Sequence, residues 1–62
     1  MSVVKESVWN VEFVGDYFQL ISTVIADDEE QAVANAIHLL QQHYGIDIDA
    51  ITNEIEVMEI AQ

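Results

Sequence analysis

The chain has 62 residues, enough for one domain covering residues 1–62, and 52% of them are hydrophobic, which excludes a disordered acidic tail. Twelve Asp and Glu residues against the single Lys5 give a net charge of −11, which argues against direct binding to nucleic acid or anionic membranes because phosphate contacts need Lys and Arg. Cysteine is absent, so disulfides and thiolate metal sites are excluded, and no apolar run approaches the ~20 residues of a transmembrane helix.

Two strands joined by a tight turn are predicted near the start of the chain. Residues 7–14 alternate between apolar and polar types, which is typical of a half-buried strand. Its predicted inward face consists of Trp9, Val11 and Phe13. Residues 15–16 read as a turn in which Gly15 supplies a positive φ, and residues 17–26 read as a second strand. So short a link predicts an antiparallel hairpin.

A helix is predicted from about residue 28 to residue 44. It follows four consecutive acidic residues, in which Asp27 and Glu30 match the pattern of a capping box. This structural role accounts well for the acidic run, and a calcium site or a partner site is the alternative. Gly45 is typical of the left-handed residue that ends a helix. The predicted buried stripe recurs at helical spacing and consists of Val33, Ala36, Ile37, Leu40 and Tyr44, widened by Ala32 and Leu39.

The rest of the chain completes an α+β fold. Residues 46–52 are predicted to form a loop held down by Ile46 or Ile48, and residues 53–60 a third strand with Ile55 and Val57 facing the helix. The connection rules favour a ββαβ unit: a three-stranded antiparallel sheet of order 2-1-3 with one helix packed on one face. The alternative places the third strand beside the second and makes that pair parallel, which is the less common arrangement.

The face of the sheet that the helix leaves bare is predicted to be partly apolar. An apolar patch with a polar rim often marks an interaction surface, and small domains often gain stability from a partner subunit. We therefore expect self-association as a homodimer, although scattered surface hydrophobics are normal on a monomer. The predicted self-association residues are Val8, Tyr17, Ile21, Ile25 and Met58.

Signatures of catalysis or of cofactor binding are missing from the sequence. His38 and His43 are five residues apart on the helix, so they point away from each other and do not form a metal-binding pair. Asp47 and Asp49 match only half of a calcium loop, whose sixth and twelfth positions here lack the required Gly and Glu. No glycine-rich phosphate loop or serine elbow is present. We predict no enzyme, no cofactor and no metal site.

The surplus of carboxylates is the main functional clue. With one cation in the chain, internal salt bridges do not neutralise them, so a basic protein surface is the expected partner. The hypothesis is that the protein docks onto a basic, nucleic-acid-binding surface of a larger protein and blocks it. The alternative is a self-associating structural or assembly protein whose charge serves solubility. The predicted partner-binding residues are Glu12, Asp27, Asp28, Glu29, Glu30, Glu54 and Glu56.

Three segments carry a resemblance to a known group of proteins. Residues 15–18 (Gly-Asp-Tyr-Phe), residues 25–32 (Ile-Ala-Asp-Asp-Glu-Glu-Gln-Ala) and residues 44–47 (Tyr-Gly-Ile-Asp) resemble small acidic accessory proteins of tailed bacteriophages. The resemblance implies a phage-type inhibitor that imitates DNA and acts on a host or defence protein. It assigns no functional residue. The expected location is the cytoplasm, that of the host cell if the protein is encoded by a phage.

Overall fold

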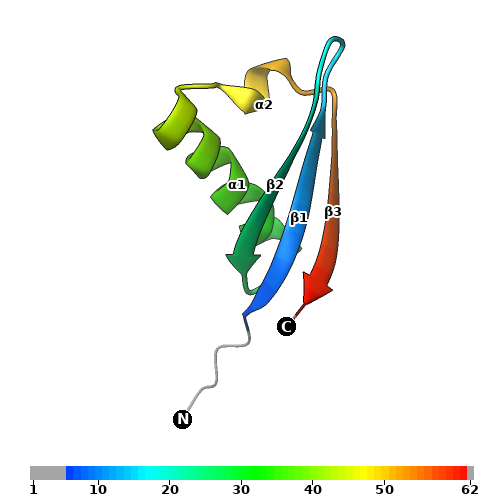
Figure 1. Cartoon of the computed structure of the whole chain (residues 1–62), viewed down its shortest axis with the longest axis vertical. Helices are drawn as coiled ribbons and strands as arrows, with labels where there is room; N and C mark the ends of the chain where they lie inside the picture. The colour runs from blue at the N-terminus through cyan, green and yellow to red at the C-terminus, as the bar shows by residue number, and fades with distance from the viewer. Residues whose placement is uncertain (1–5, 62) are drawn as a thin grey trace.

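The computed structural model (Figure 1) describes residues 6–61, which form three strands and two helices. In chain order they are β1 (Ser7–Val14), β2 (Gln19–Ala26), α1 (Glu29–Tyr44), α2 (Ile48–Ile51) and β3 (Glu54–Ala61). β1 is the central strand, the strand order is β2-β1-β3, and both strand pairs are antiparallel. The predicted α+β fold, with the third strand beside the first, is therefore confirmed.

The core lies between α1 and one face of the sheet. Phe13 of β1 has no exposed surface, as its place in the alternating pattern predicts. Ala32 and Ala36 of α1 are also fully buried, and such small side chains let the helix approach the strands closely. Trp9 packs against this core and donates a hydrogen bond from Nε1 to the carbonyl of Ala26 at 2.9 Å. The indole therefore ties the start of β1 to the end of β2.

The helix covers the sheet unevenly. α1 packs mainly against β2 and less against β1 and β3, and β3 lies on the far side of β1 from it in Figure 1. Ile55 and Val57 of β3 face the helix side, as predicted, because they pair with Phe13 and Val11 of β1. Ile55 nevertheless stays 38% exposed, since the helix does not reach across to it. β3 is therefore poorly covered even on its inner face.

The N-terminal cap of α1 differs from the prediction by one residue. The cap is Asp28, whose side chain accepts a hydrogen bond from the backbone amide of Gln31 at 2.8 Å. The predicted pair of Asp27 and Glu30 is wrong, because β2 extends to Ala26 and Asp27 is used in the link to the helix. The first turn then contains Glu29 and Glu30, which still suit the positive end of the helix dipole.

The C-terminal end of α1 agrees with the prediction at its cap and differs in its packing. Gly45 adopts the left-handed conformation, with φ of 64°, and its amide donates to the carbonyl of Gln41 at 3.0 Å. Tyr44, predicted to be buried, is 69% exposed because it lies in the last turn of the helix. Ile48, one of the two residues predicted to hold this segment down, is 1% exposed. It lies in the one-turn helix α2, where a loop was predicted.

The turn between β1 and β2 is longer than predicted. Val14 pairs with Gln19, so the turn comprises residues 15–18 and β2 begins two residues later than the sequence suggested. Gly15 donates its amide to the carbonyl of Phe18 at 3.0 Å and lacks the predicted positive φ, which within residues 6–61 only Gly45 adopts. Glycine is needed at position 15 for another reason: a Cβ there would overlap the Phe18 ring.

Candidate functional site

The side of the sheet opposite α1, here called the open face, has an acidic half. Glu12 of β1 lies directly opposite Glu56 of β3, and Glu54 follows on the same face beside Val14. We call Glu12, Glu54 and Glu56 the open-face carboxylates. Gln19 of β2 donates its side-chain amide to Glu12. The strand register therefore brings together three of the acidic residues that the sequence predicted to bind a partner.

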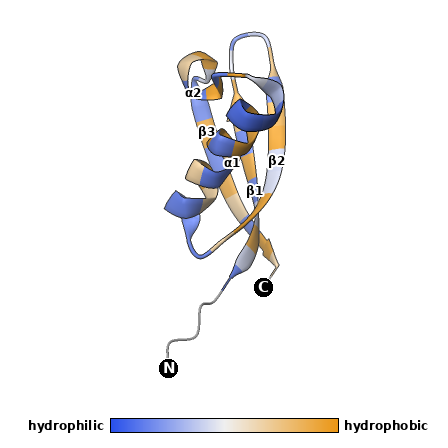
Figure 2. Ribbon diagram, turned by 90° about the vertical axis from the view of Figure 1, so that its left-hand side faces the viewer, coloured by the Kyte–Doolittle hydropathy of each residue, from blue (hydrophilic) through white to orange (hydrophobic). Residues whose placement is uncertain are grey.

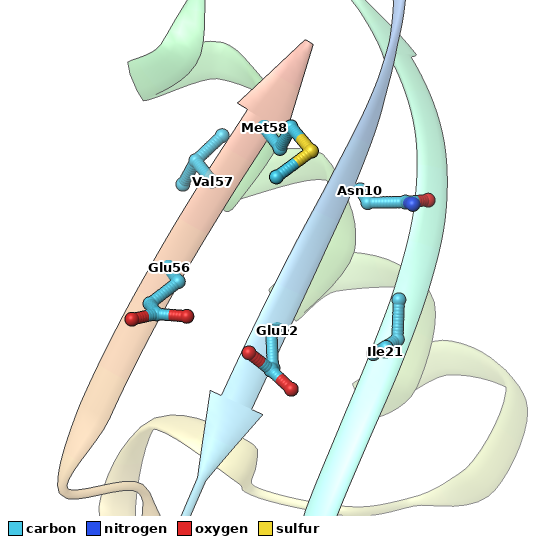
Figure 3. Close-up of a pocket in the computed structure, with 6 residues that line it drawn as sticks. All are labelled: Asn10, Glu12, Ile21, Glu56, Val57 and Met58. Carbon is cyan, nitrogen blue, oxygen red and sulfur yellow. The ribbon is translucent and has the colours of Figure 1, made fainter. Parts of the chain in front are cut away.

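Figure 3 shows how two of these side chains, those of Glu12 and Glu56, lie. The carboxylates of Glu12 and Glu56 project from neighbouring strands beside Ile21 of β2. Together with Asn10, Val57 and Met58 they line an open hollow of about 500 Å³. Ile21 and Met58 contribute apolar side chains to its lining, and the two carboxylates contribute charged ones. Such a surface suits a long cationic side chain, whose stem packs on apolar groups while its charged end reaches a carboxylate.

Repulsion within this group changes the acidity of one member. The pKa of Glu56 is raised from 4.5, first by a hydrogen bond with the Glu12 side chain and then by the charges of Glu12 and Glu54. Both causes favour the protonated form of Glu56, because a neighbouring negative charge opposes the ionisation of a carboxyl group. A cation placed between Glu12 and Glu56 would oppose this repulsion. The open-face carboxylates are therefore arranged to gain from a positively charged partner.

This arrangement predicts an unusual dependence of stability on pH. Because the pKa of Glu56 is raised in the folded state, the folded state binds a proton more tightly than the unfolded chain does. The stability that this proton contributes is fully present below pH 4.5. It is lost as the pH rises through the raised pKa. The melting temperature should therefore rise as the pH is lowered from neutrality toward 4.5. Thermal melts of the domain and of Glu56→Gln will test this: the variant should show a flatter profile, and identical profiles would contradict the assignment to Glu56.

The other end of the open face has most of its exposed apolar side chains. Val8 of β1 lies between Ile25 of β2 and Ala61 of β3, and Met58 is in the next row. Ile25 is 59% exposed and Met58 is 65% exposed. In the same row as Met58, Thr23 donates a hydrogen bond to the side-chain oxygen of its neighbour on β1 at 2.7 Å. Along the direction of the strands, the open face therefore has an apolar end and an acidic end.

The predicted self-association residues are only partly brought together. Val8, Ile25 and Met58 form the apolar end of the open face, whereas Ile21 lies in the acidic half beside Glu12. Tyr17 is 99% exposed in the turn between β1 and β2, away from the other four. Sequence periodicity placed all of them outside the core correctly, but it did not resolve how they are distributed along the strands.

The remaining predicted acidic residues lie on the helix side of the sheet, where three of them line an open hollow together with Val57 of β3. Residues 27–30 follow the end of β2, and Figure 2 shows this end of α1 as strongly hydrophilic. The end of β2 pairs with Ser7, five residues along β1 from Glu12, which corresponds to about 17 Å in an extended strand. Asp28 is also occupied as the helix cap. The seven predicted residues therefore form two separate groups.

Residues 6–61 contain no metal-binding cluster and no membrane-spanning helix. Within this range no group of three or more His, Asp and Glu side chains is placed to hold a metal ion. No helix in the described part of the chain has the length and apolar character needed to cross a membrane. The sequence did not reveal that β3 is exposed. The alternating pattern predicted that Ile55 faces the helix and is buried, but it is 38% exposed.

The chain was also compared with known proteins. No protein-family model, no curated protein and no solved structure matches it.

Proposed function

We propose that this domain is a protein-binding module that occupies a basic, nucleic-acid-binding surface of a larger protein. One observation carries the proposal: all twelve carboxylates lie within residues 6–61, which contain no Lys or Arg, and every one except the half-buried Glu12 is exposed. Their mutual repulsion is not relieved inside the described part of the molecule. A cationic surface would relieve it and would be attracted from a distance.

The open face supports this proposal because it combines carboxylates with exposed apolar side chains. Planar Arg side chains form paired hydrogen bonds with carboxylates, and the facing pair of Glu12 and Glu56 offers four oxygen atoms to such a group. An Arg side chain bound there would offset the repulsion between Glu12 and Glu56. The exposed apolar residues of the same face would add contact area that a purely electrostatic encounter lacks.

The biological setting that we propose follows from the resemblance to small acidic accessory proteins of tailed bacteriophages. In that setting the domain is a phage-type inhibitor that lies in the host cytoplasm and competes with DNA or RNA for a host or defence protein. The proposal needs no catalytic group, cofactor or metal. Its requirement is that the partner surface also binds nucleic acid.

A competition experiment tests the proposal. The domain is immobilised and exposed to a lysate of host cells at low salt, and retained proteins are eluted with duplex DNA or with high salt. We expect a basic protein that both treatments release, because phosphates and carboxylates would compete for the same Arg and Lys side chains. Immobilised polyglutamate serves as the control, and proteins that it also retains are discounted. If DNA releases no protein specific to the domain, the proposal is wrong.

A second candidate function is self-assembly, which the apolar end of the open face favours. Val8, Ile25 and Met58 lie together and are partly or largely exposed. Covering them with a second copy would bury apolar surface that a domain of this size gains from burying. Light scattering across a range of concentrations distinguishes the two functions, because an assembly protein would show a concentration-dependent dimer mass without any partner.

A further inference from the structure

β3 is a sheet edge whose two faces are both exposed. Met58 on the open face is 65% exposed, and Ile55 on the helix side is 38% exposed. Ile60, near the end of the strand, is 48% exposed. Along the whole strand, the residue with the least exposure is the half-buried Val57. Of the three strands, β3 is therefore the one with the most apolar surface still to cover.

The backbone of β3 also has unused hydrogen-bonding groups. The carbonyl of Val14 accepts from the amide of Asn53 at 2.8 Å, so Val14 directs its backbone polar groups toward β3. The backbone N–H and C=O groups of successive residues in a strand point to alternate edges. The backbone groups of Glu12 therefore also point toward β3, and those of its partner Glu56 point back toward β1. Ile55 and Val57, the intervening helix-side residues, therefore present their N–H and C=O groups to the free edge.

The opposite edge of the sheet is less accessible. α1 packs mainly against β2. The side chain of Asn35 donates a hydrogen bond to the carbonyl of Ile25 at 3.0 Å, which occupies one of the outward groups of β2. Helix residues thus partly cover the β2 edge, whereas β3 has no comparable side-chain cap within residues 6–61. An added strand would find β3 the more open of the two.

The charges of β3 select what can pair with it. Glu54, Glu56 and Glu59 place three carboxylates on an eight-residue strand. Charged residues on an edge strand disfavour pairing with a second copy, since like charges on adjacent strands repel. The same carboxylates attract Arg and Lys. The charge of this edge therefore disfavours pairing with a second copy and favours pairing with a basic strand.

We propose that the free edge of β3 binds an extended basic segment as a fourth, antiparallel strand of the sheet. Its Arg or Lys residues lie on the open face beside Glu54 and Glu56, and its alternate apolar residues cover Ile55 and Val57 on the helix side. This inference rests on the proposed function and names the type of contact that the basic partner makes. Main-chain hydrogen bonds along an exposed edge provide affinity, and the alternating side chains provide specificity.

The test uses the full chain, labelled with ¹⁵N, and a nine-residue peptide of alternating Arg and Val. Two matched peptides carry the same number of backbone N-methyl groups, either on the valines or on the arginines. In the antiparallel arrangement the valine amides face β3, because residues opposite Ile55 and Val57 share their face. Binding is measured by titration, and amide hydrogen exchange is followed residue by residue.

We expect the unmodified and the arginine-methylated peptides to bind and the valine-methylated peptide to lose binding. Hydrogen exchange of the Ile55 and Val57 amides should slow about tenfold, because each amide would form one hydrogen bond with the peptide. The amides of Ile21 and Thr23, on the β2 edge, serve as internal controls and should be unchanged. Failure of the unmodified peptide to bind would overturn the inference.

Other outcomes separate this inference from the proposed function. If all three peptides bind alike and the β3 amides stay unprotected, the contact is electrostatic and strand addition is wrong, while the proposed function stands. If the β3 amides become protected at high protein concentration without peptide, a second copy pairs there and the inference is wrong. If strand addition is observed but the lysate experiment fails, the edge is confirmed as a binding element and the blocking function is not.

Discussion

Replacing Phe13 with alanine is expected to lower the free energy of unfolding by about 3–5 kcal/mol, the usual cost of removing a fully buried aromatic side chain. Phe13 has no exposed surface and is among the largest fully buried side chains in residues 6–61. A domain of this size has a total stability of only about 5 kcal/mol. The variant should therefore be largely unfolded at room temperature, which circular dichroism and the dispersion of amide NMR signals will show.

Tyr17→Ala is the matched control for Phe13→Ala. It removes an aromatic side chain of similar size that is 99% exposed, so the free energy of unfolding should change by no more than about 0.5 kcal/mol. If Phe13→Ala melts at the same temperature as Tyr17→Ala, the core is not where the structure places it. If both variants unfold, Tyr17 contacts something that residues 6–61 of one chain do not provide.

The second large effect is expected from the triple variant Glu12→Gln, Glu54→Gln and Glu56→Gln. Each substitution keeps the shape of the side chain and removes one charge, so three contacts to Arg or Lys would be weakened. Hydrogen bonds to charged groups contribute about 1.5–3 kcal/mol each, and a factor of ten in affinity corresponds to about 1.4 kcal/mol. The affinity for a protein captured in the competition experiment should fall by about a hundredfold or more, as measured by calorimetry.

A control with the same change in net charge separates the open face from a general charge effect. Glu6→Gln, Asp47→Asn and Asp49→Asn remove three exposed carboxylates that lie outside the predicted partner-binding set. This control should lose much less affinity than the open-face variant. Equal losses would mean that the partner senses total charge and that Glu12, Glu54 and Glu56 have no special role. The open-face variant should also unfold no more easily than the parent, because it removes repulsion.

The fold could be predicted from the sequence because local and global signals agree. Period-two alternation in β1 placed Phe13 inward, and the register of β1 with β3 then required Ile55 and Val57 to share that face. Antiparallel pairing was the simplest arrangement for three strands and one crossover. These signals depend on which face each residue occupies, and sequence periodicity reports that directly.

The errors in the prediction occur where several local solutions have similar energies. Asp27 and Asp28 are equally good N-caps by type, and the choice of Asp28 depends on β2 extending to Ala26. α2 has only four residues, too few for a helical period to be recognised. The reason for glycine at position 15 is contact with the Phe18 ring, which depends on the length of the turn.

The candidate site was predicted as a set of residues but not as an arrangement. Acidic residue types alone identified Glu12, Glu54 and Glu56, yet their grouping depends on Glu12 lying opposite Glu56 across two strands that are far apart in sequence. The same register separates them from residues 27–30. The exposure of β3 was hidden because helix coverage depends on where α1 crosses the sheet, and apolar alternation in β3 carries no information about that.

The strand order β2-β1-β3 has a consequence for synthesis of the protein in the cell. The central strand β1 leaves the ribosome early, whereas the neighbour on one of its sides is the last element of residues 6–61 to be made. During that interval the hairpin and α1 can assemble, but Phe13 and Val11 lack the flanking residues of β3. The nascent chain therefore carries an incomplete sheet until β3 emerges, and only the long-range pairing of β3 with β1 completes that sheet.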